Sequence, residues 1–538
     1  MAPIADKVPD DCPGAREIGF AVPARYNASA ILFDNLARRN GDRPALRGPG
    51  GTLTYDALCL SANRAGNALT SLGLARGDRV VMICDDTPLY PAFLFGAMRA
   101  GLVPVLVNTL TPPDLIQFYL ADAAARAAVV EADCAGQLTA EAVRDTKLEA
   151  VIVANGQAAL PHVRRVIEAT PWLAEFSDRL DPADTHRDDM AFWMYSSGST
   201  GRPKGIVHLQ HDMAYTAESY AKHMLKLAPD DICFSVPKIF FAYGFGNSLT
   251  FPFSVGASSV LCPGKPDPAK IFSAIASFRP TVFFGLPTLY TALAKAPEAA
   301  AADCSGLRLC VSAAEILSGE VAAAWKSLTG LDIVEGLGST EMLHIYLSNS
   351  ADARRQSSAG RRVPGYEIRL ADGDGREVPD GEEGIMSVRG HSSAPEYWNR
   401  PDKTAETMRG DWIYSADRFV RDHDGFYFFR GRADDLVKVS GQWVYPLEVE
   451  LCLAEHKAVR EVAVLALELP DRRMTLKAYV VTADPATDPK ALTAELQDYV
   501  KRTLLPHKYP RIVEYLSELP KTGTGKIDRQ ALVRRGAA

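Results

Sequence analysis

The sequence predicts an α/β protein with a large N-terminal domain, built from β/α subdomains and a β module, and a small α+β C-terminal domain. Three observations support this fold class. Helical and strand patterns alternate from about residue 29 to 182, and again from about 189 to 332. Glycines and charged residues then interrupt short alternating runs between residues 361 and 431. A compact unit of roughly one hundred residues follows, which is a normal size for a small domain.

The first β/α region begins with an amphipathic pattern over residues 30–39, which indicates a helix. Residues 79–84 begin with Arg79 and continue with five apolar side chains, three of them β-branched, which indicates a strand that Asp85 and Asp86 end. A further helix and strand are expected at residues 91–100 and 102–107. This alternation predicts a largely parallel sheet that is covered on both faces.

The second β/α region repeats the pattern, with no short internal repeat of 20–50 residues. Residues 190–194 (Met-Ala-Phe-Trp-Met) are typical of a buried strand. Further short strands are expected at residues 258–261, 281–284 and 307–311.

The last third of the chain has a different pattern of residues. Residues 367–370 and 385–388 alternate apolar and polar side chains, which predicts an antiparallel β module. We place a domain boundary near Asp434, so that the N-terminal domain covers residues 1–433 and the C-terminal domain covers residues 434–538. Within the second domain, the pattern predicts helices at residues 448–456 and 492–504 and strands at residues 462–467 and 478–481.

Composition excludes several classes of function. The chain has 538 residues, 47% of them hydrophobic, and a net charge of −7 without a long basic run, which argues against binding nucleic acid or an anionic membrane. It lacks both an N-terminal apolar signal and the roughly 20-residue apolar stretch of a spanning helix. Its nine cysteines are scattered, with no zinc-like spacing, and Cys304 and Cys310 flank a strand of the core. We therefore expect a cytoplasmic protein with reduced thiols.

The segment from Tyr195 to Gly205, YSSGSTGRPKG, follows the strand at residues 190–194. Glycines let backbone N–H groups converge on an anion, hydroxyl groups add donors, and Lys204 adds positive charge. These features indicate a loop that binds a polyphosphate, although the spacing is not that of a Walker motif. The alternative is a flexible surface loop, which rarely carries Thr-Gly-x-Pro-Lys-Gly after an apolar strand.

The segment resembles the phosphate-binding motif of the ANL adenylate-forming superfamily, which includes acyl-CoA synthetases, adenylation domains and luciferases. Other motifs of that superfamily follow in the same order: FFAYG (240–244), STE (339–341), WIYSAD (412–417), GRADD (431–435) and PKTGTGK (520–526). Within the superfamily, KIFFAYGFGNSLTFP (238–252) and GLGSTEMLHIYLSN (336–349) most resemble benzoate-CoA ligases. The resemblance covers most of the chain and implies that the C-terminal domain rotates on a hinge.

The resemblance implies ATP and Mg²⁺ as cofactors and coenzyme A as co-substrate. Glu341 and Thr200 are expected at the metal, because Mg²⁺ is usually held by one or two protein oxygens together with phosphate oxygens. Asp417 is expected to accept the ribose hydroxyls, and Arg432 to assist at the ribose or phosphate. The full set expected to bind the nucleotide is Ser196, Ser197, Gly198, Ser199, Thr200, Gly201, Lys204, Ala314, Glu315, Glu335, Gly336, Leu337, Thr340, Asp417 and Arg432.

Two residues depart from the family's adenine-binding pattern. Leu337 stands where many relatives have an aromatic residue, so stacking on adenine is expected to be weaker. Ala314 stands where benzoate-CoA ligases usually have glycine, and the added methyl group is expected to reshape the pocket.

Two lysines resemble those that serve the two half-reactions. Lys526, in the Gly-Thr-Gly-Lys turn, matches the lysine that stabilises charge during adenylation. Lys438 matches the lysine that acts in thioester formation after the domain rotates, and its alternative role is that of a surface lysine on an edge strand. Asp434 matches the hinge residue.

The acyl pocket is expected to be a short, flat slot lined by aromatic and small residues, which suits one aromatic ring better than a long alkyl chain. His344 is expected to bind a ring substituent or the carboxylate, and its alternative role is structural. The candidate lining residues are Phe241, Ala242, Tyr243, Ala313, Gly336, Gly338, His344 and Ile345.

Together these motifs predict an ATP-dependent aryl-CoA ligase that acts on benzoate, or on a substituted or heteroaromatic relative, through an acyl-AMP intermediate. A protein that loads a separate carrier protein, a medium-chain or alicyclic acyl-CoA synthetase, and a non-catalytic nucleotide-binding protein are the alternatives. A kinase is disfavoured because its catalytic loop is missing. A homodimer is a reasonable expectation for the oligomeric state.

Overall fold

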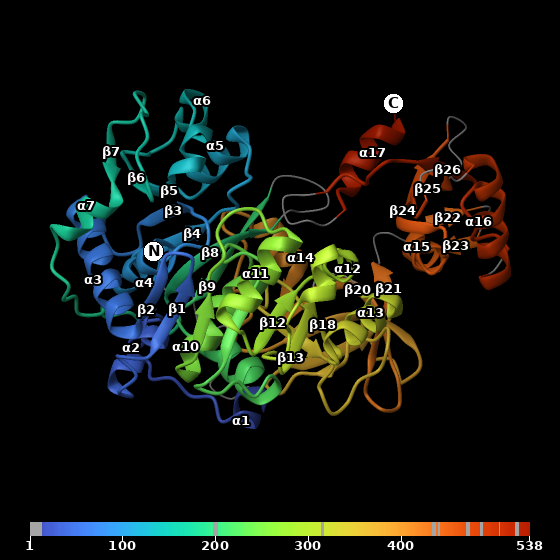
Figure 1. Ribbon diagram of the computed structural model, residues 1–538, viewed down its shortest axis with the longest axis horizontal. Helices are drawn as coiled ribbons and strands as arrows, with labels where there is room; N and C mark the ends of the chain where they lie inside the picture. The colour runs from blue at the N-terminus through green and yellow to red at the C-terminus, as the bar shows by residue number, and fades with distance from the viewer. Residues whose placement is uncertain are drawn as a thin grey trace. The chain divides into compact units, whose positions relative to one another are not determined.

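The computed structural model describes residues 13–196, 203–313, 317–432, 437–439, 442–469, 474–484, 488–504, 506–521 and 527–537. These residues form a mixed α/β fold with several sheets, shown in Figure 1, which confirms the predicted fold class. No helix among them is both long and apolar enough to cross a membrane.

The first large sheet has seven strands in the order β7-β6-β5-β3-β4-β8-β9. All neighbours are parallel except the β8–β9 pair, which is antiparallel. Its strands are β3 (Arg79–Ile83), β4 (Val103–Leu106), β5 (Ala127–Glu131), β6 (Ala150–Ala154), β7 (Arg165–Glu168), β8 (Met190–Ser196) and β9 (Lys204–Leu209). The strands predicted at residues 79–84, 102–107 and 190–194 are therefore confirmed.

The helices that accompany the first region are α1 (Pro13–Glu17), α2 (Ala30–Ala37), α3 (Tyr55–Ser71), α4 (Leu89–Arg99), α5 (Pro113–Asp122), α6 (Ala140–Val143) and α7 (Ala169–Ala174). Helix α3 begins where the Thr54 side chain accepts a hydrogen bond from the Ala57 backbone N–H, at 3.2 Å. Helices α3 and α4 touch at Gly66 and Gly96, where a Cβ on Gly96 would lie 2.8 Å from the Gly66 backbone nitrogen. The contact brings the two helix backbones together because neither residue has a side chain.

The second large sheet has nine strands in the order β16-β15-β14-β13-β12-β10-β11-β1-β2. Its strands are β1 (Pro44–Gly48), β2 (Gly51–Thr54), β10 (Ile232–Ser235), β11 (Ser258–Val260), β12 (Val282–Gly285), β13 (Leu309–Ala313), β14 (Ile333–Gly338), β15 (Ile345–Ser348) and β16 (Arg361–Arg362). The interior pairs from β1 to β14 are parallel, and the pairs at both ends are antiparallel. Strands β1 and β2 precede the first sheet in the sequence but complete the second, because β1 pairs with β11.

Helices of the second region are α8 (Asp212–Thr216), α9 (Ala242–Phe245), α10 (Phe251–Val255), α11 (Pro268–Phe278), α12 (Pro287–Lys295) and α13 (Gly319–Thr329). Trp325 of α13 is fully buried and stacks on Phe283 of β12, with ring centroids 5.9 Å apart. Cys304 and Cys310 belong to the same buried cluster, as the sequence predicts. The eight described cysteines are free thiols.

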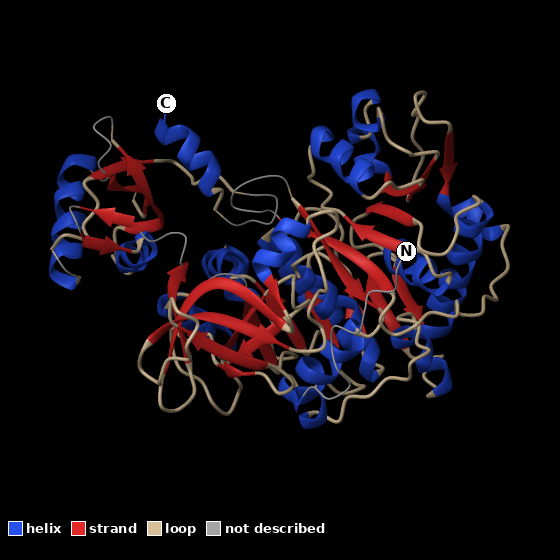
Figure 2. Cartoon of the chain, turned by 180° about the vertical axis from the view of Figure 1, so that it is seen from behind, coloured by secondary structure: helices blue, strands red, loops and turns tan. Residues whose placement is uncertain are grey.

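A third sheet contains β17 (Glu367–Ala371), β18 (Glu383–Arg389), β19 (Met408–Arg409), β20 (Trp412–Arg421) and β21 (Tyr427–Arg432), with α14 (Pro401–Thr407) beside β19. The β19–β20 and β20–β21 pairs are antiparallel, in agreement with the predicted β module. Figure 2 distinguishes the strands of this module, in red, from the helices.

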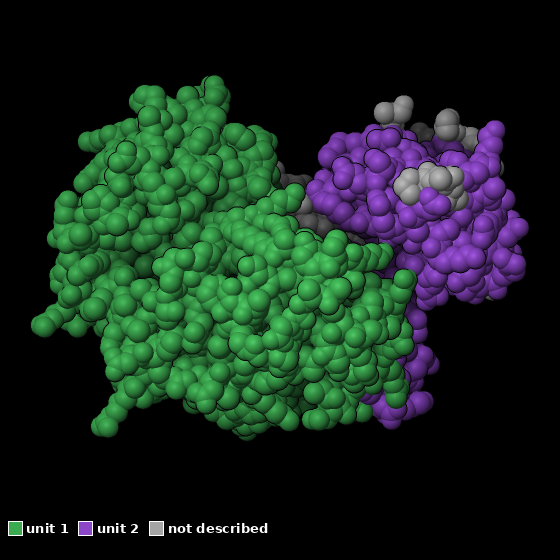
Figure 3. All heavy atoms as spheres, in the orientation of Figure 1, with its two compact units in different colours: residues 1–367, 388–413 green, residues 368–387, 414–538 purple. Residues whose placement is uncertain are grey.

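The C-terminal part contains the hairpin of β22 (Val437–Val439) and β23 (Gln442–Val444) and a three-stranded sheet of β24 (Val459–Glu468), β25 (Met474–Thr482) and β26 (Ile512–Tyr515). Its helices are α15 (Pro446–Ala454), α16 (Pro489–Thr503) and α17 (Arg529–Ala537). The chain divides into two compact units, coloured separately in Figure 3: Met1–Glu367 with Val388–Ile413, and Ile368–Ser387 with Tyr414–Ala538.

The contact between helices α3 and α4 generates a prediction. Replacing Gly96 by Ala should lower the free energy of unfolding by about 1–3 kcal/mol, because the added methyl group meets backbone atoms that cannot move aside. Urea unfolding measures this loss. The matched control is Gly136→Ala, where a Cβ would have nothing within 4 Å, and equal losses in the two variants would contradict the account.

Candidate active site

The predicted phosphate loop lies between the paired strands β8 and β9. Ser196 and Lys204 are register partners at the ends of these strands. The predicted residues Ser197, Gly198, Ser199, Thr200 and Gly201 lie outside the described residues. The hairpin therefore fixes where the loop leaves and re-enters the sheet.

Tyr397 links Lys204 to Glu341. Its hydroxyl donates a hydrogen bond of 2.7 Å to Glu341 Oε1, and the Lys204 ammonium lies 4.2 Å from the centre of its ring. Burial and the charge of Glu341 raise the pKa of Tyr397, so the phenol stays protonated and continues to donate. The Ala394 backbone N–H donates to the Glu341 carbonyl oxygen at 2.7 Å. The ring of Tyr397 thus lies between the Lys204 ammonium and the Glu341 carboxylate and contacts both groups.

A chain of buried side chains, here called the histidine brace (His208, Asp212 and His211), supports the loops on both sides of Glu341. His208 Nε2 donates to the Thr340 carbonyl oxygen at 2.9 Å, and its Nδ1 lies 2.8 Å from Asp212 Oδ2. The side chains of His208 and Asp212 are fully buried. His211 Nε2 donates to the His391 carbonyl oxygen at 2.8 Å and lies 3.5 Å from the other Asp212 oxygen.

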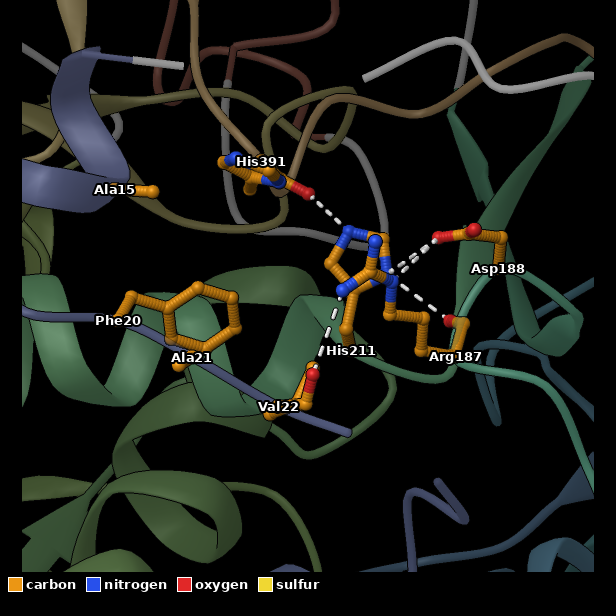
Figure 4. Close-up of a pocket in the computed structure, with 8 residues that line it drawn as sticks. All are labelled: Ala15, Phe20, Ala21, Val22, Arg187, Asp188, His211 and His391. Atoms are coloured by element: carbon orange, nitrogen blue, oxygen red, sulfur yellow. Dashed lines mark hydrogen bonds and ion pairs between the residues drawn. The ribbon is translucent and has the colours of Figure 1, made fainter. Parts of the chain in front are cut away.

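The far end of the histidine brace lines a separate pocket, shown in Figure 4, with a volume of about 130 Å³. There His211 Nδ1 donates to the Arg187 carbonyl oxygen at 3.0 Å and lies 3.7 Å from Asp188 Oδ1. Two carboxylates, those of Asp188 and Asp212, thus lie within 4 Å of the ring nitrogens of His211. None of the predicted site residues lines this pocket.

The predicted adenine-binding residues gather on neighbouring parallel strands. Ala313, a predicted acyl residue, ends β13 and is the register partner of Gly336 on β14, while Glu335 and Leu337 flank Gly336. Burial raises the pKa of Glu335 to about 7, although the Leu317 backbone N–H donates to its side chain at 3.1 Å. Ala314 and Glu315 lie outside the described residues.

The predicted acyl residues come together from helix α9 and strand β15. Tyr243 and His344 have ring centroids 5.6 Å apart, and His344 Nε2 lies 3.3 Å from the Tyr243 carbonyl oxygen. Burial lowers the pKa of His344 to about 3, so its imidazole is neutral. A Cβ on Gly336 would lie 2.8 Å from Ile345 Cδ1, so the glycine leaves room for that side chain.

The other predicted acyl residues surround this meeting point. Ala242 begins α9, and Gly338 ends β14, where a Cβ would meet the His344 backbone. The ring of Phe241 packs edge-on against Phe240, with centroids 4.6 Å apart. The structure thus joins Tyr243, His344, Ile345 and Gly336 by contacts, whereas the ring of Phe241 packs against Phe240.

Two predicted nucleotide-binding residues belong to the second compact unit. Asp417 and Arg432 are register partners on β20 and β21, and Arg432 Nη1 lies 3.5 Å from Asp417 Oδ1. The backbone of Lys438 lies in β22. Asp434 and Lys526 lie outside the described residues.

No group of three or more His, Cys, Asp or Glu side chains within the described ranges could hold a metal ion. A site for Mg²⁺ does not need such a group, because this ion commonly keeps several water ligands and binds substrate phosphates through one or two carboxylates. Glu341, a partly exposed carboxylate beside the phosphate-loop hairpin, fits that pattern.

Sequence reasoning missed Tyr397 and the three residues of the histidine brace. Tyr397 lies 56 residues from Glu341 in the chain, and His208 lies 132 residues from Thr340. For Tyr397, the local signal in the sequence is the aromatic pair Tyr397-Trp398. For the histidine brace, it is the sequence His-Leu-Gln-His-Asp at residues 208–212, shortly after the phosphate loop.

The raised pKa of Glu335 predicts a pH-dependent stability. The folded protein binds this proton more tightly than the unfolded chain, so the contribution of Glu335 to stability falls as pH rises from about 4.5 to about 7. Glu335→Gln removes the ionisation. Its free energy of unfolding relative to wild type should therefore increase between pH 5 and pH 8, by roughly 1–3 kcal/mol in urea titrations.

The control for this prediction is Glu149→Gln. The hydrogen bond from Arg126 lowers the pKa of the Glu149 carboxyl, so this substitution should show no such increase. A difference between Glu335→Gln and wild type that is the same at both pH values would contradict the assignment.

Comparison with known proteins identifies the family of the chain. The family described as AMP-binding enzyme matches residues 33–398, and the AMP-binding enzyme C-terminal domain matches residues 448–526. The chain is 41% identical over 511 residues to benzoate–CoA ligase from Thauera aromatica, covering 94% of this chain and 96% of that protein.

Two solved structures are similar over nearly their whole length. Anthranilate CoA ligase AuaEII in complex with anthranoyl-AMP has a TM-score of 0.89 and 36% identity, covering 96% of this chain and 98% of that chain. Benzoate CoA ligase from Burkholderia xenovorans LB400 has a TM-score of 0.86 and 38% identity, covering 94% of this chain and 100% of that chain. The chain therefore belongs to the AMP-binding enzyme family, in agreement with its adenylate-forming motifs.

Proposed function

We propose that this protein is an ATP-dependent aryl-CoA ligase. A carboxylate oxygen of the acid attacks the α-phosphorus of ATP, the bond to the β-phosphate breaks, and pyrophosphate leaves. The thiolate of coenzyme A then attacks the acyl carbon of the acyl-AMP, and AMP leaves as the thioester forms. Because both leaving groups come from ATP, no nucleophilic side chain is needed.

The observation that carries this proposal is the meeting of Tyr243 and His344 beside the glycine-bearing strand β14. Aromatic rings and small residues at this place suit an aromatic acid better than a long alkyl chain. The neutral His344 adds a polar group without a charge, which suits a hydroxyl or amino substituent on the ring. Benzoate and anthranilate, named in the similar ligases, are the first substrates to test.

The residues of the first compact unit divide the work of adenylation. The Ser196–Lys204 loop holds the phosphates by backbone N–H groups and charge. Glu341 and Thr200 hold Mg²⁺, which neutralises phosphate charge when bound. Tyr397 orients Glu341 through its hydrogen bond. The nucleoside is received by Thr340, Ala314, Glu315, Glu335, Gly336 and Leu337, and the acid by Phe241, Ala242, Tyr243, Ala313, Gly338, His344 and Ile345.

The residues from Asp417 onward serve the two half-reactions in turn. Asp417 accepts the ribose hydroxyls with help from Arg432, and Lys526 stabilises the negative charge that develops during adenylation. The domain from residue 434 then rotates about Asp434 and brings Lys438 to the site for thioester formation. We also propose that the enzyme acts in the cytoplasm and that it is a homodimer.

The test of the function is AMP release from ATP, with and without coenzyme A, across benzoate, aminobenzoates, hydroxybenzoates, furoate, cyclohexanecarboxylate, octanoate and acetate. Coenzyme-A-dependent release with the aromatic acids alone supports the proposal. A preference for octanoate or cyclohexanecarboxylate would assign a different acyl substrate. Release of pyrophosphate without any coenzyme A product would indicate a protein that loads a carrier.

The division of roles predicts that two variants lose different half-reactions. Lys526→Ala should slow adenylation by roughly 100- to 1,000-fold and leave thioester formation from supplied benzoyl-AMP largely intact. Asp434→Pro should retain adenylation and block thioester formation, because proline fixes the backbone at the hinge. Pyrophosphate exchange and single-turnover thioester formation measure the two steps, and a parallel loss of both in either variant would refute its role.

A further inference from the structure

Two adjacent acids at the end of strand β3 contact the segment that leads into helix α9. The Lys238 ammonium lies 2.6 Å from Asp85 Oδ1 and 3.9 Å from Asp86 Oδ2. The Ile239 backbone N–H donates to Asp86 Oδ1 at 3.1 Å. We call these three side chains, Asp85, Asp86 and Lys238, the acidic clamp. The clamp ties the first large sheet to the segment that begins KIFFAYG.

The acidic clamp also holds the loop that follows β11. Lys238 donates to the Cys262 carbonyl oxygen at 2.8 Å, and the Gly264 backbone N–H donates to Asp85. The side chains are 14% exposed for Lys238 and 3% for Asp86, so little water screens their charges. Lys238 is thus the cation that compensates two neighbouring carboxylates in a buried setting.

Lys238 compensates the negative charge of Asp85 and Asp86 only in part. Burial raises the pKa of Asp86 to about 7, even with Lys238 beside it. Removing the cation would leave two carboxylates close together away from water, which is costly. The segment that carries Lys238 is therefore held in one place by charge as well as by hydrogen bonds.

Backbone contacts connect the segment around Lys238 to the predicted acyl residues. Gly244, in the first turn of α9, lies against the carbonyl groups of Pro237 and Lys238, and a Cβ there would clash with both. The Phe241 backbone N–H donates to the Lys238 carbonyl oxygen at 3.1 Å. Any shift of the Lys238 backbone therefore moves α9, which carries Ala242 and Tyr243.

We propose that the acidic clamp positions the acyl pocket and thereby sets the affinity for the aromatic acid. The inference rests on the proposed function, because it assumes that Tyr243 and its neighbours bind that acid. None of the three clamp residues belongs to the predicted phosphate, adenine or ribose sites. The clamp should consequently affect the KM for the acid and leave the KM for ATP nearly unchanged.

The experiment compares the KM for benzoate and for ATP in full-length wild type, Lys238→Met, Asp85→Asn and a matched control, Lys270→Met. Lys270 is a suitable control because its ammonium binds the Pro263 carbonyl oxygen in the same loop. Thermal melting shows that each variant is folded, and Asp85→Asn keeps the shape of the side chain if Lys238→Met does not fold.

We expect the KM for benzoate to rise about tenfold or more in both clamp variants, Lys238→Met and Asp85→Asn. The KM for ATP of these variants should stay within about twofold of wild type. In Lys270→Met, both KM values should stay within about twofold of wild type. Equal changes in both KM values, or a change in Lys270→Met as large as that in the clamp variants, would overturn the proposal that the acidic clamp positions the acyl pocket. Absence of turnover of every aromatic acid by the wild type would instead reject the proposed function, so the two failures are distinguishable.

Discussion

The position of Glu341 depends on one buried carboxylate, that of Asp212. It holds His208, which binds the Thr340 carbonyl oxygen, and it lies beside His211, which binds the His391 carbonyl oxygen. Each of these carbonyl groups belongs to one of the two loops that meet at Glu341, since Ala394 and Tyr397 bind it from the second loop. Because the carboxylate is fully buried, its hydrogen bonds are strong and there is no water to replace them.

The same principle recurs at the acyl segment, where Lys238 compensates Asp85 and Asp86. In both places a short polar cluster inside the protein fixes loops that lie between strands and helices. Loops carry the residues that contact ligands, but they lack the regular hydrogen bonds that would hold them in place. Buried charged side chains therefore hold the loops whose positions the hydrogen bonds of the sheets do not determine.

The sequence was sufficient for those strands whose apolar runs, such as residues 80–84 and 190–194, have a clear pattern and recognisable ends. It also predicts a phosphate loop and a metal-binding role for Glu341 from contiguous motifs, and these roles stay predictions. It did not place β1 and β2 in the second large sheet, because their pairing with β11 joins residues more than two hundred positions apart. Tyr397 and the histidine brace were missed for the same reason, since their partners are distant in the chain.

The pairing of β1 with β11 has a consequence for synthesis of the chain. Residues 44–48 leave the ribosome early, but their parallel partner, residues 258–260, does not yet exist. At roughly 5–20 residues per second, the N-terminal strand waits on the order of ten seconds or more for its neighbour. During that interval the edge of β1 that pairs with β11 is open, so this hairpin joins its sheet only after the second β/α region has been made.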